Sequence, residues 1–275
     1  MANRDFLVFR LQGPMAAWGA VAVGERRPTW DLPSKSAVLG LVAAGLGLTR
    51  GDAPGHAALE AGLGFAVRQD AAGRPLRDYH TAQAPKARRN AQWRTRRDEL
   101  AGDKDDLNTV LSERLYRLEA AATVALWRRG DAGAAPALPD LAAGLVRPRY
   151  TLFLGRKSCP LGRPPRPRTV AADGLLAAFS AYDAAEGAAG LHLPLWLNRG
   201  RPPADAPRDV WFEWHAGLAA EESQVLAGDD GQHRQRRDAV ADRARWQFTD
   251  RREGRLVWRA PVIGEGAVVG KGDTP

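Results

Sequence analysis

Short apolar runs separated by glycine and proline dominate the first part of the chain. Residues 5–11 are mostly apolar and stop just before Gly13, a pattern typical of a buried strand. Residues 37–48 are apolar on nearly all sides, which indicates a helix buried between two layers, and Ser34 is a favourable N-cap ahead of them. The sequence therefore predicts a central strand followed by a buried helix.

The rest of the chain alternates between apolar runs and long polar stretches. The apolar runs predict a short helix at 56–62, strands at 64–70, 123–127 and 150–154, a helix at 173–183, and strands at 191–200, 208–216 and 254–263. Residues 221–253 are charged and follow neither period, so we expect irregular structure there. The order of these elements, with a β-rich end, predicts an α+β fold of the split βαβ type.

A polar, basic insertion interrupts this order at residues 77–106. It shows no apolar period, and about 30 residues is longer than an ordinary connection inside a compact domain. Uncommonly long connections usually serve a function or are mobile. We therefore expect an extension that takes part in binding.

The positive charge is concentrated in two stretches of the chain. Residues 77–97 hold seven Lys or Arg and one acidic residue, and residues 147–168 hold seven Lys or Arg and no acidic residue. Together these stretches exceed the formal net charge of +8, so the rest of the chain is net negative. Local basicity of this kind suits a phosphate-binding surface. Arginine-rich loops that only face water are the alternative.

Several functional classes are disfavoured by simple features. The N-terminus lacks the features of a signal peptide, and no apolar run has the roughly 20 residues that span a bilayer, so we expect a cytoplasmic protein without membrane contact. The single cysteine, Cys159, cannot form an internal disulfide, and the five histidines show no metal-ligand spacing. No P-loop pattern surrounds Lys35. We expect no metal and no cofactor.

Two places favour anion binding by the backbone. Gly155 allows the chain to turn with a ligand close by, successive N–H groups there form an anion-binding concavity, and Arg156 and Lys157 add charge. Residues 34–36 place two hydroxyls and an ammonium at a helix N-terminus. The alternatives are a rigid connector at Gly155 and an ordinary N-cap at Ser34.

The insertion mixes aromatic and basic side chains. Rings stack on unpaired bases while cations meet phosphates, which suits single-stranded RNA. The residues concerned include Tyr79, His80, Arg88, Arg89 and Trp93. Protein binding or a solvated extension are alternatives. His80, assisted by Tyr79 or Lys86, is also a candidate general base that deprotonates a 2′-hydroxyl, so a metal-independent endoribonuclease is the alternative function.

Several stretches together resemble one protein family. "FLVFRLQGPMAAWG", "RRPTWDLPSKSAVLGLVAAGLGLTRGD", "RDYHT", "TVALW" and "LGRKSCPL" resemble, in this order, CasD-type subunits (Cas five family, RAMP superfamily) of the type I-E CRISPR surveillance complex Cascade. The resemblance implies one ferredoxin-like (RRM-type) domain over residues 1–275. It also implies a β-hairpin thumb at about 78–112 and a β-rich C-terminal part at about 190–265. The acidic residues 220–231 match nothing in the family pattern.

The resemblance also implies a function. Family members are non-catalytic subunits that cap one end of the complex, bind the 5′ handle of the CRISPR RNA and support antiviral defence. It implies contacts with the backbone subunit CasC and the large subunit CasA, and with target DNA only indirectly or near the thumb. The implied handle contacts are Arg26, Arg27, Ser34, Lys35, Ser36, Gly155, Arg156, Lys157, Ser158 and Cys159.

Overall fold

A seven-stranded antiparallel sheet forms the middle layer of the protein. The computed structural model describes residues 3–86, 92–130, 135–186, 206–214, 232–242, 245 and 247–259. The strands follow the order β10 (Arg168–Ala172), β1 (Arg4–Gln12), β9 (Ala121–Arg128), β6 (Leu63–Ala71), β11 (Arg208–Glu213), β13 (Gln247–Trp258) and β12 (Gln232–Asp242). β10 and β12 are therefore the two edges of the sheet.

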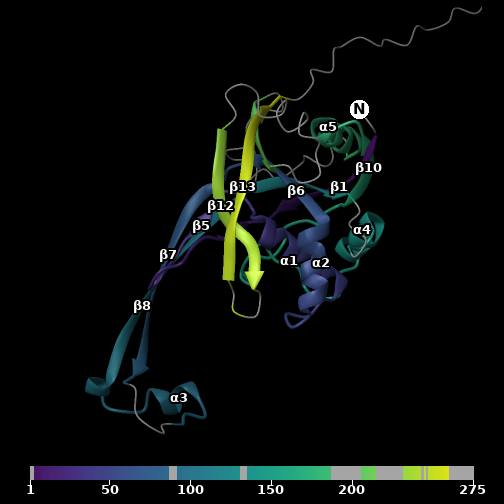
Figure 1. Ribbon diagram of the computed structural model, residues 1–275. Helices are drawn as coiled ribbons and strands as arrows, with labels where there is room; N and C mark the ends of the chain where they lie inside the picture. The colour runs from purple at the N-terminus through teal and green to yellow at the C-terminus, as the bar shows by residue number, and fades with distance from the viewer. Residues whose placement is uncertain are drawn as a thin grey trace, which may run out of the picture.

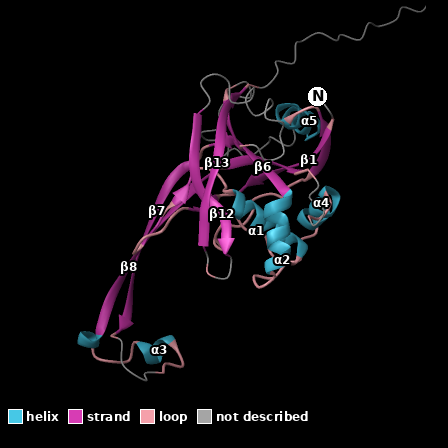
Figure 2. Cartoon of the chain, viewed as in Figure 1, coloured by secondary structure: helices cyan, strands magenta, loops and turns pink. Residues whose placement is uncertain are grey.

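Helices cover both faces of this sheet (Figures 1 and 2). The helices α1 (Lys35–Leu46), α2 (Ala53–Gly62) and α4 (Leu138–Val146) share one apolar core with the sheet, and α5 (Leu175–Glu186) shares a second core with the opposite face. Within β1, Leu7 and Phe9 enter the first core and Phe6 and Val8 enter the second. A strand buried on both faces has no polar face, which explains the continuous apolar run.

A long β-hairpin projects from this body. It is built from β7 (Arg74–Pro85) and β8 (Leu107–Leu118), with the short helices α3 (Arg96–Glu99) and η1 (Lys104–Asp106) at its far end. On its other edge β8 pairs with β2 (Met15–Ala16) and, in parallel, with β4 (Arg26–Arg27). A two-stranded ladder of β3 (Trp18–Gly19) and β5 (Thr29–Trp30) completes this N-terminal region.

Most predicted elements are confirmed. The strand at 5–11 is β1, and the buried helix is α1, in which the Ser34 hydroxyl accepts a hydrogen bond from the Ala37 N–H at 3.2 Å. The predictions at 56–62, 64–70, 123–127 and 173–183 fall on α2, β6, β9 and α5, and the mixed α+β class with mainly antiparallel sheet is confirmed. The strand predicted at 191–200 and the acidic residues 220–231 lie outside the described residues.

Two predictions about secondary structure are wrong. Residues 150–154 form no strand beyond one isolated bridge from Phe153 to Pro160. Their backbone instead bonds to α1 and to an N-terminal loop: the Tyr150 N–H donates to the Ala44 carbonyl, and the Leu154 carbonyl accepts from Ala17.

The second error concerns the charged stretch 221–253. Within it, β12 and most of β13 form an antiparallel hairpin with two register shifts in β12. Buried charges pair across and along its strands: Asp238 of β12 accepts two hydrogen bonds of 2.9 Å from Arg251 of β13, and Arg251 also donates to Glu253 of the same strand at 2.8 Å. Buried charges are tolerated when paired and hydrogen-bonded, so high charge did not preclude a strand. The edge strand β10 was also not predicted.

Candidate nucleic-acid interface

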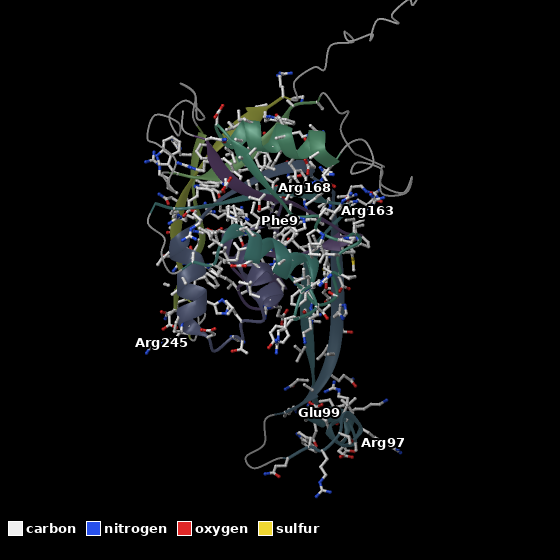
Figure 3. All side chains as sticks on the ribbon, turned by 90° about the vertical axis from the view of Figure 1, so that its right-hand side faces the viewer. Phe9, Arg97, Glu99, Arg163, Arg168 and Arg245 are labelled. Atoms are coloured by element: carbon white, nitrogen blue, oxygen red, sulfur yellow. The ribbon has the colours of Figure 1, made fainter. Side chains whose placement is uncertain are left out.

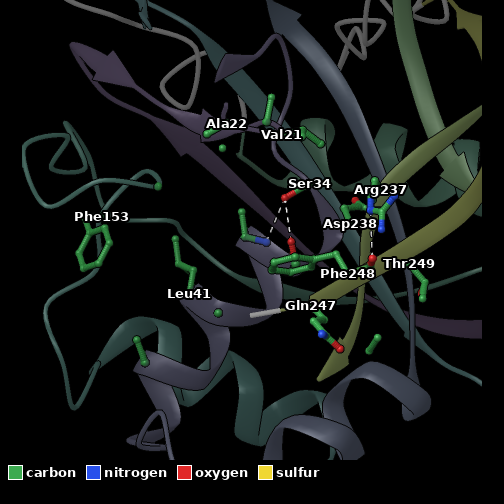
Figure 4. A pocket seen from close by; sticks show the side chains of 18 of the residues that line it. Val21, Ala22, Ser34, Leu41, Phe153, Arg237, Asp238, Gln247, Phe248 and Thr249 are labelled. Carbon is green, nitrogen blue, oxygen red and sulfur yellow. Dashed lines mark hydrogen bonds between the residues drawn. The ribbon is translucent and has the colours of Figure 1, made fainter. Parts of the chain in front are cut away.

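A cavity of about 940 Å³ opens beside the N-terminal half of α1. Four segments line it: residues 19–22, the α1 residues between Ser34 and Ala44, residues 151–155, and the ends of β12 and β13. Figure 4 shows Phe153 on one side and Arg237, Gln247 and Phe248 on the other, with Leu41 of α1 between them. Segments far apart in the sequence therefore meet at one site.

Small residues of α1 line this cavity. Ala37, Gly40 and Ala44 line it at helical spacing, so no long side chain of α1 fills it at these positions. At its upper end Ser34 caps the helix, and the Ser34 and Ser36 hydroxyl oxygens lie 3.1 Å apart. The Lys35 and Ala37 N–H groups of this first turn already donate to Asp238 and Ser34, so the hydroxyls are the polar groups that face a ligand at this end of the cavity.

The β12–β13 hairpin forms one wall of the cavity. Its lining residues include Arg237, Gln247, Phe248 and Thr249. Arg237 is exposed, and its Nε donates to the Phe248 carbonyl at 3.1 Å. Sequence reasoning missed these residues because it predicted irregular structure here. The sequence carries no signal for this wall, because the buried Arg236 and Asp238 and the exposed Arg237 are all charged.

The two most distinctive sequence motifs pack against each other at the rim. Gly155 has φ +86°, and a Cβ there would collide with the Ala17 carbonyl. A Cβ on Gly13 would lie 2.6 Å from the Pro160 carbonyl. Only glycine fits such close approaches without strain. "LQGPMAAWG" and "LGRKSCPL" therefore form one structural unit.

The residues after Gly155 differ in their accessibility. Lys157 and Ser158 are exposed. Cys159 is fully buried in the core, and burial raises the pKa of its thiol. The Arg156 guanidinium contacts protein carbonyl groups, as described below. Of the four side chains, those of Lys157 and Ser158 face solvent.

Arg26 and Arg27 form β4 and are both exposed. One guanidinium nitrogen of Arg26 lies 3.1 Å from a carboxylate oxygen of Glu113 on the β7–β8 hairpin. The parallel pairing of β4 with β8 places both arginines near the base of this hairpin, beside the chain that leads to the cavity at residues 19–22. Both are exposed cations on this rim, and Arg27 Nη1 also donates to the Gly24 and Arg26 carbonyls.

Lys35 is placed differently from the sequence expectation. It is fully buried, and its Nζ lies 3.1 Å from a carboxylate oxygen of Glu213 and 3.2 Å from one of Glu60. Burial raises the pKa of Glu60, although the Lys35 ammonium acts in the opposite direction. Because the ammonium is enclosed by carboxylates, we leave Lys35 out of the proposed ligand contacts.

The remaining candidate site residues belong to the β7–β8 hairpin and do not form one cluster there. Tyr79 is 56% exposed on β7, and Trp93 is 45% exposed near the tip. His80 Nε2 lies 2.6 Å from Asp78 Oδ2, and both pair with β8 on the face opposite Tyr79. Successive strand residues point to opposite faces, so Tyr79 and His80 do not converge on one reacting group. Arg88 and Arg89 lie outside the described residues.

The described part of the chain shows neither a metal-ligand cluster nor a membrane-spanning helix. It contains no group of three or more His, Cys, Asp or Glu side chains placed to hold a metal ion. It also contains no helix that is both long and apolar enough to cross a bilayer.

Comparison with known proteins agrees with the sequence resemblance. The pattern of the family described as CRISPR-associated protein (Cas_Cas5) matches residues 6–253. The chain belongs to this CRISPR-associated family. It is also 37% identical over 169 residues to the CRISPR system Cascade subunit CasD of Escherichia coli (strain K12), which covers 58% of this chain and 69% of that protein.

Solved structures support the fold of this family member. A chain of a CRISPR RNA-guided surveillance complex superposes with a TM-score of 0.59 at 23% identity, covering 95% of this chain and 92% of that one. A crystal structure of a Cas protein superposes with a TM-score of 0.51 at 24% identity, covering 92% and 95%. At these identities the likeness concerns the fold.

Proposed function

We propose that this chain is a subunit of a Cascade-type CRISPR surveillance complex and that it binds the 5′ handle of the CRISPR RNA for antiviral defence. The related CasD and the superposed chain are both parts of such assemblies by name. The cavity beside α1 is the observation that carries the proposal. Its volume of about 940 Å³ falls at the upper end of ordinary ligand pockets.

The chemistry of the cavity fits single-stranded RNA. Sequence-specific RNA recognition uses unstacked bases that enter pockets and stack on rings, while cations meet the phosphates. Phe153 and Phe248 supply rings, Ser36 supplies a hydroxyl, and Arg237 supplies a cation within the lining. Arg26, Arg27, Lys157 and Ser158 extend this polar and basic rim outside it. We propose that the handle enters along this rim.

The finer architecture belongs to the same proposal. We assign the body to the ferredoxin-like RAMP type and the β7–β8 hairpin to the thumb, which contributes Tyr79, His80 and Trp93 to RNA or protein contacts. The proposed protein partners are CasC and CasA, and target DNA approaches only near the thumb. Arg88 and Arg89 stay with the thumb as proposed RNA contacts.

We propose a binding role without catalysis. A ribonuclease in which Tyr79 assists His80 needs both groups at one phosphate, and the two residues lie on opposite faces of β7. Incubating the purified chain with repeat RNA in chelator tests the alternative. A 2′,3′-cyclic phosphate product that disappears in His80→Ala would support the ribonuclease instead.

A variant that fills the cavity tests the handle site. Ala37→Leu places a large side chain in the lining of α1 and keeps a strong helix former. Ala57→Leu makes the same change on the exposed side of α2 and serves as the control. We expect Ala37→Leu to weaken binding of handle RNA at least tenfold by fluorescence anisotropy, with an unchanged circular dichroism spectrum. Equal affinity in both variants would contradict the handle site.

A further inference from the structure

We propose that Arg156 is a positioning residue that fixes the direction of the β7–β8 hairpin, and that it does not bind phosphate. Its guanidinium bridges three segments of the protein at the hairpin base. The proposal rests on this geometry. Its consequence for RNA binding rests in addition on the proposed function.

The outer edge of β8 has a gap at its centre. β2 pairs with β8 at Arg117 and Leu118, and β4 pairs with it at Glu113 and Arg114. Between these two ladders, the Leu115 carbonyl accepts a hydrogen bond of 3.2 Å from Arg156 Nη1. Buried or half-buried carbonyl groups need a partner, so Arg156 completes the edge at the point between the two short strands.

The same guanidinium ties this edge to β4 and to a ring. Arg156 Nη2 donates to the Arg27 carbonyl at 3.0 Å, and the guanidinium carbon lies 4.8 Å from the centre of the Tyr116 ring. Tyr116 is buried in the main core, which makes its ring a fixed reference. The planar guanidinium serves both carbonyl groups and the ring at once.

The backbone fixes the position of the loop that carries Arg156. Gly155 sits against the Ala17 carbonyl with φ +86°, so the loop that carries Arg156 has little freedom to shift. The hairpin has other anchors near its base, including an ion pair of 2.9 Å between Arg117 and Asp31. Loss of Arg156 is therefore expected to loosen the direction of the hairpin without unfolding it.

A small change of angle at this base is amplified along the hairpin. Leu107 lies eight residues beyond Leu115, which at the usual rise corresponds to about 27 Å. A rotation of about 10° at the base therefore displaces the far end by roughly 5 Å. Contacts made by the tip, where Arg97 lies, depend on this angle (Figure 3).

The variant Arg156→Lys distinguishes a positioning role from a phosphate contact. A lysine keeps the positive charge that a phosphate needs, but it lacks the planar fork that reaches two carbonyl groups while stacking on a ring. A positioning role predicts that Arg156→Lys behaves like Arg156→Gln. A phosphate contact predicts that Arg156→Lys behaves like the unaltered chain.

A distance measurement between spin labels tests the direction of the hairpin. Gly51 on the body and Gly102 near the tip both face open space at the position where a Cβ would stand, so each accepts a labelled cysteine in a Cys159→Ala background. We expect pulsed electron resonance to show a broadened or shifted distance distribution in both Arg156 variants. An unchanged distribution in both would overturn the proposal.

The salt dependence of RNA binding supplies an independent readout. Each lost phosphate contact makes the slope of log affinity against log salt shallower by about 0.7 for single-stranded RNA. We expect Lys157→Ala to show this change with handle RNA and Arg156→Gln to keep the original slope. A shallower slope in Arg156→Gln with an unchanged label distance would show a phosphate contact. If the unaltered chain fails to bind the RNA, the proposed function fails while the label distances still decide the role of Arg156.

Discussion

Lys35 carries its charge inside the protein, at the point where α1, α2 and β11 meet. Its Nζ is enclosed by Glu60 and Glu213, and its backbone N–H donates to Asp238 Oδ2 at 2.9 Å. Asp238 belongs to β12, so the start of α1 is tied to the hairpin that forms one wall of the cavity. The Lys35 side chain thus holds α1 against α2 and β11, while the backbone N–H of the same residue holds α1 to β12.

Replacing Lys35 tests this role. Lys35→Met removes the cation that Glu60 and Glu213 share, and Glu213 keeps its ion pair with Arg129. Breaking a buried pair typically costs about 3–5 kcal/mol. We expect a loss near the lower end of this range in the free energy of unfolding, measured by urea denaturation, and partial recovery when Glu60→Gln is added. Lys104→Met, at an exposed position, is the control. A loss no larger than that of the control would contradict the buried network.

Cys159 offers a second test at the residue scale. It is fully buried, and burial raises the pKa of its thiol, so the reactive thiolate is scarce and inaccessible at neutral pH. We expect its reaction with a thiol reagent at a pH of about 7.5 to be far slower in the folded chain than in urea. Equal rates in the two conditions would place Cys159 at the surface.

At the scale of elements, a helix or strand was predictable from the sequence when the pattern of its own residues is enough to specify it. β1 and α1 bury apolar side chains on every side, so their sequence carries the signal. The β12–β13 hairpin depends on ion pairs between residues of different strands, such as Arg251 with Asp238, and single-strand periodicity does not contain that information. Residues 150–154 are apolar, yet their backbone partners lie in α1 and an N-terminal loop.

The candidate site was likewise predictable from the sequence only in part. Ser34 and Gly155 were recognised because an N-cap and a positive φ are local requirements. The wall at Arg237 and Phe248, and the enclosure of Lys35, depend on which elements meet in three dimensions. Local chemistry therefore located two of the four segments that line the cavity, and only the fold supplied the wall formed by β12 and β13.

A further prediction concerns the wall of the cavity that the β12–β13 hairpin forms. Arg237 is exposed and lines the cavity, whereas Arg252 of the same hairpin is exposed over Trp214 and does not line it. We expect Arg237→Gln to weaken handle RNA binding several-fold and to make the salt slope shallower by about 0.7. Arg252→Gln is the control, and both variants should unfold at the same urea concentration as the unaltered chain. Equal effects of the two variants on RNA binding would remove Arg237 from the site.

At the scale of the whole molecule, the two basic stretches occupy separate places. Residues 77–97 belong mainly to the β7–β8 hairpin, while Arg163 and Arg168 lie on the body, and Figure 3 shows them well apart from Arg97 at the tip. One RNA strand that follows the body and then meets the hairpin can contact both surfaces. Contact with both surfaces requires the hairpin to keep a fixed direction relative to the body. We propose that Arg156 provides this direction.

The handle site as a whole depends on the RNA lying in the cavity beside α1. The most direct measurement places 4-thiouridine at single positions of the handle of a guide RNA, assembles the complete complex, crosslinks it with light and maps the adducts by mass spectrometry. We expect adducts in this chain within residues 19–27, 34–44, 151–158 and 237–249. Adducts confined to other subunits, or found in this chain only with the label outside the handle, would contradict the proposed site.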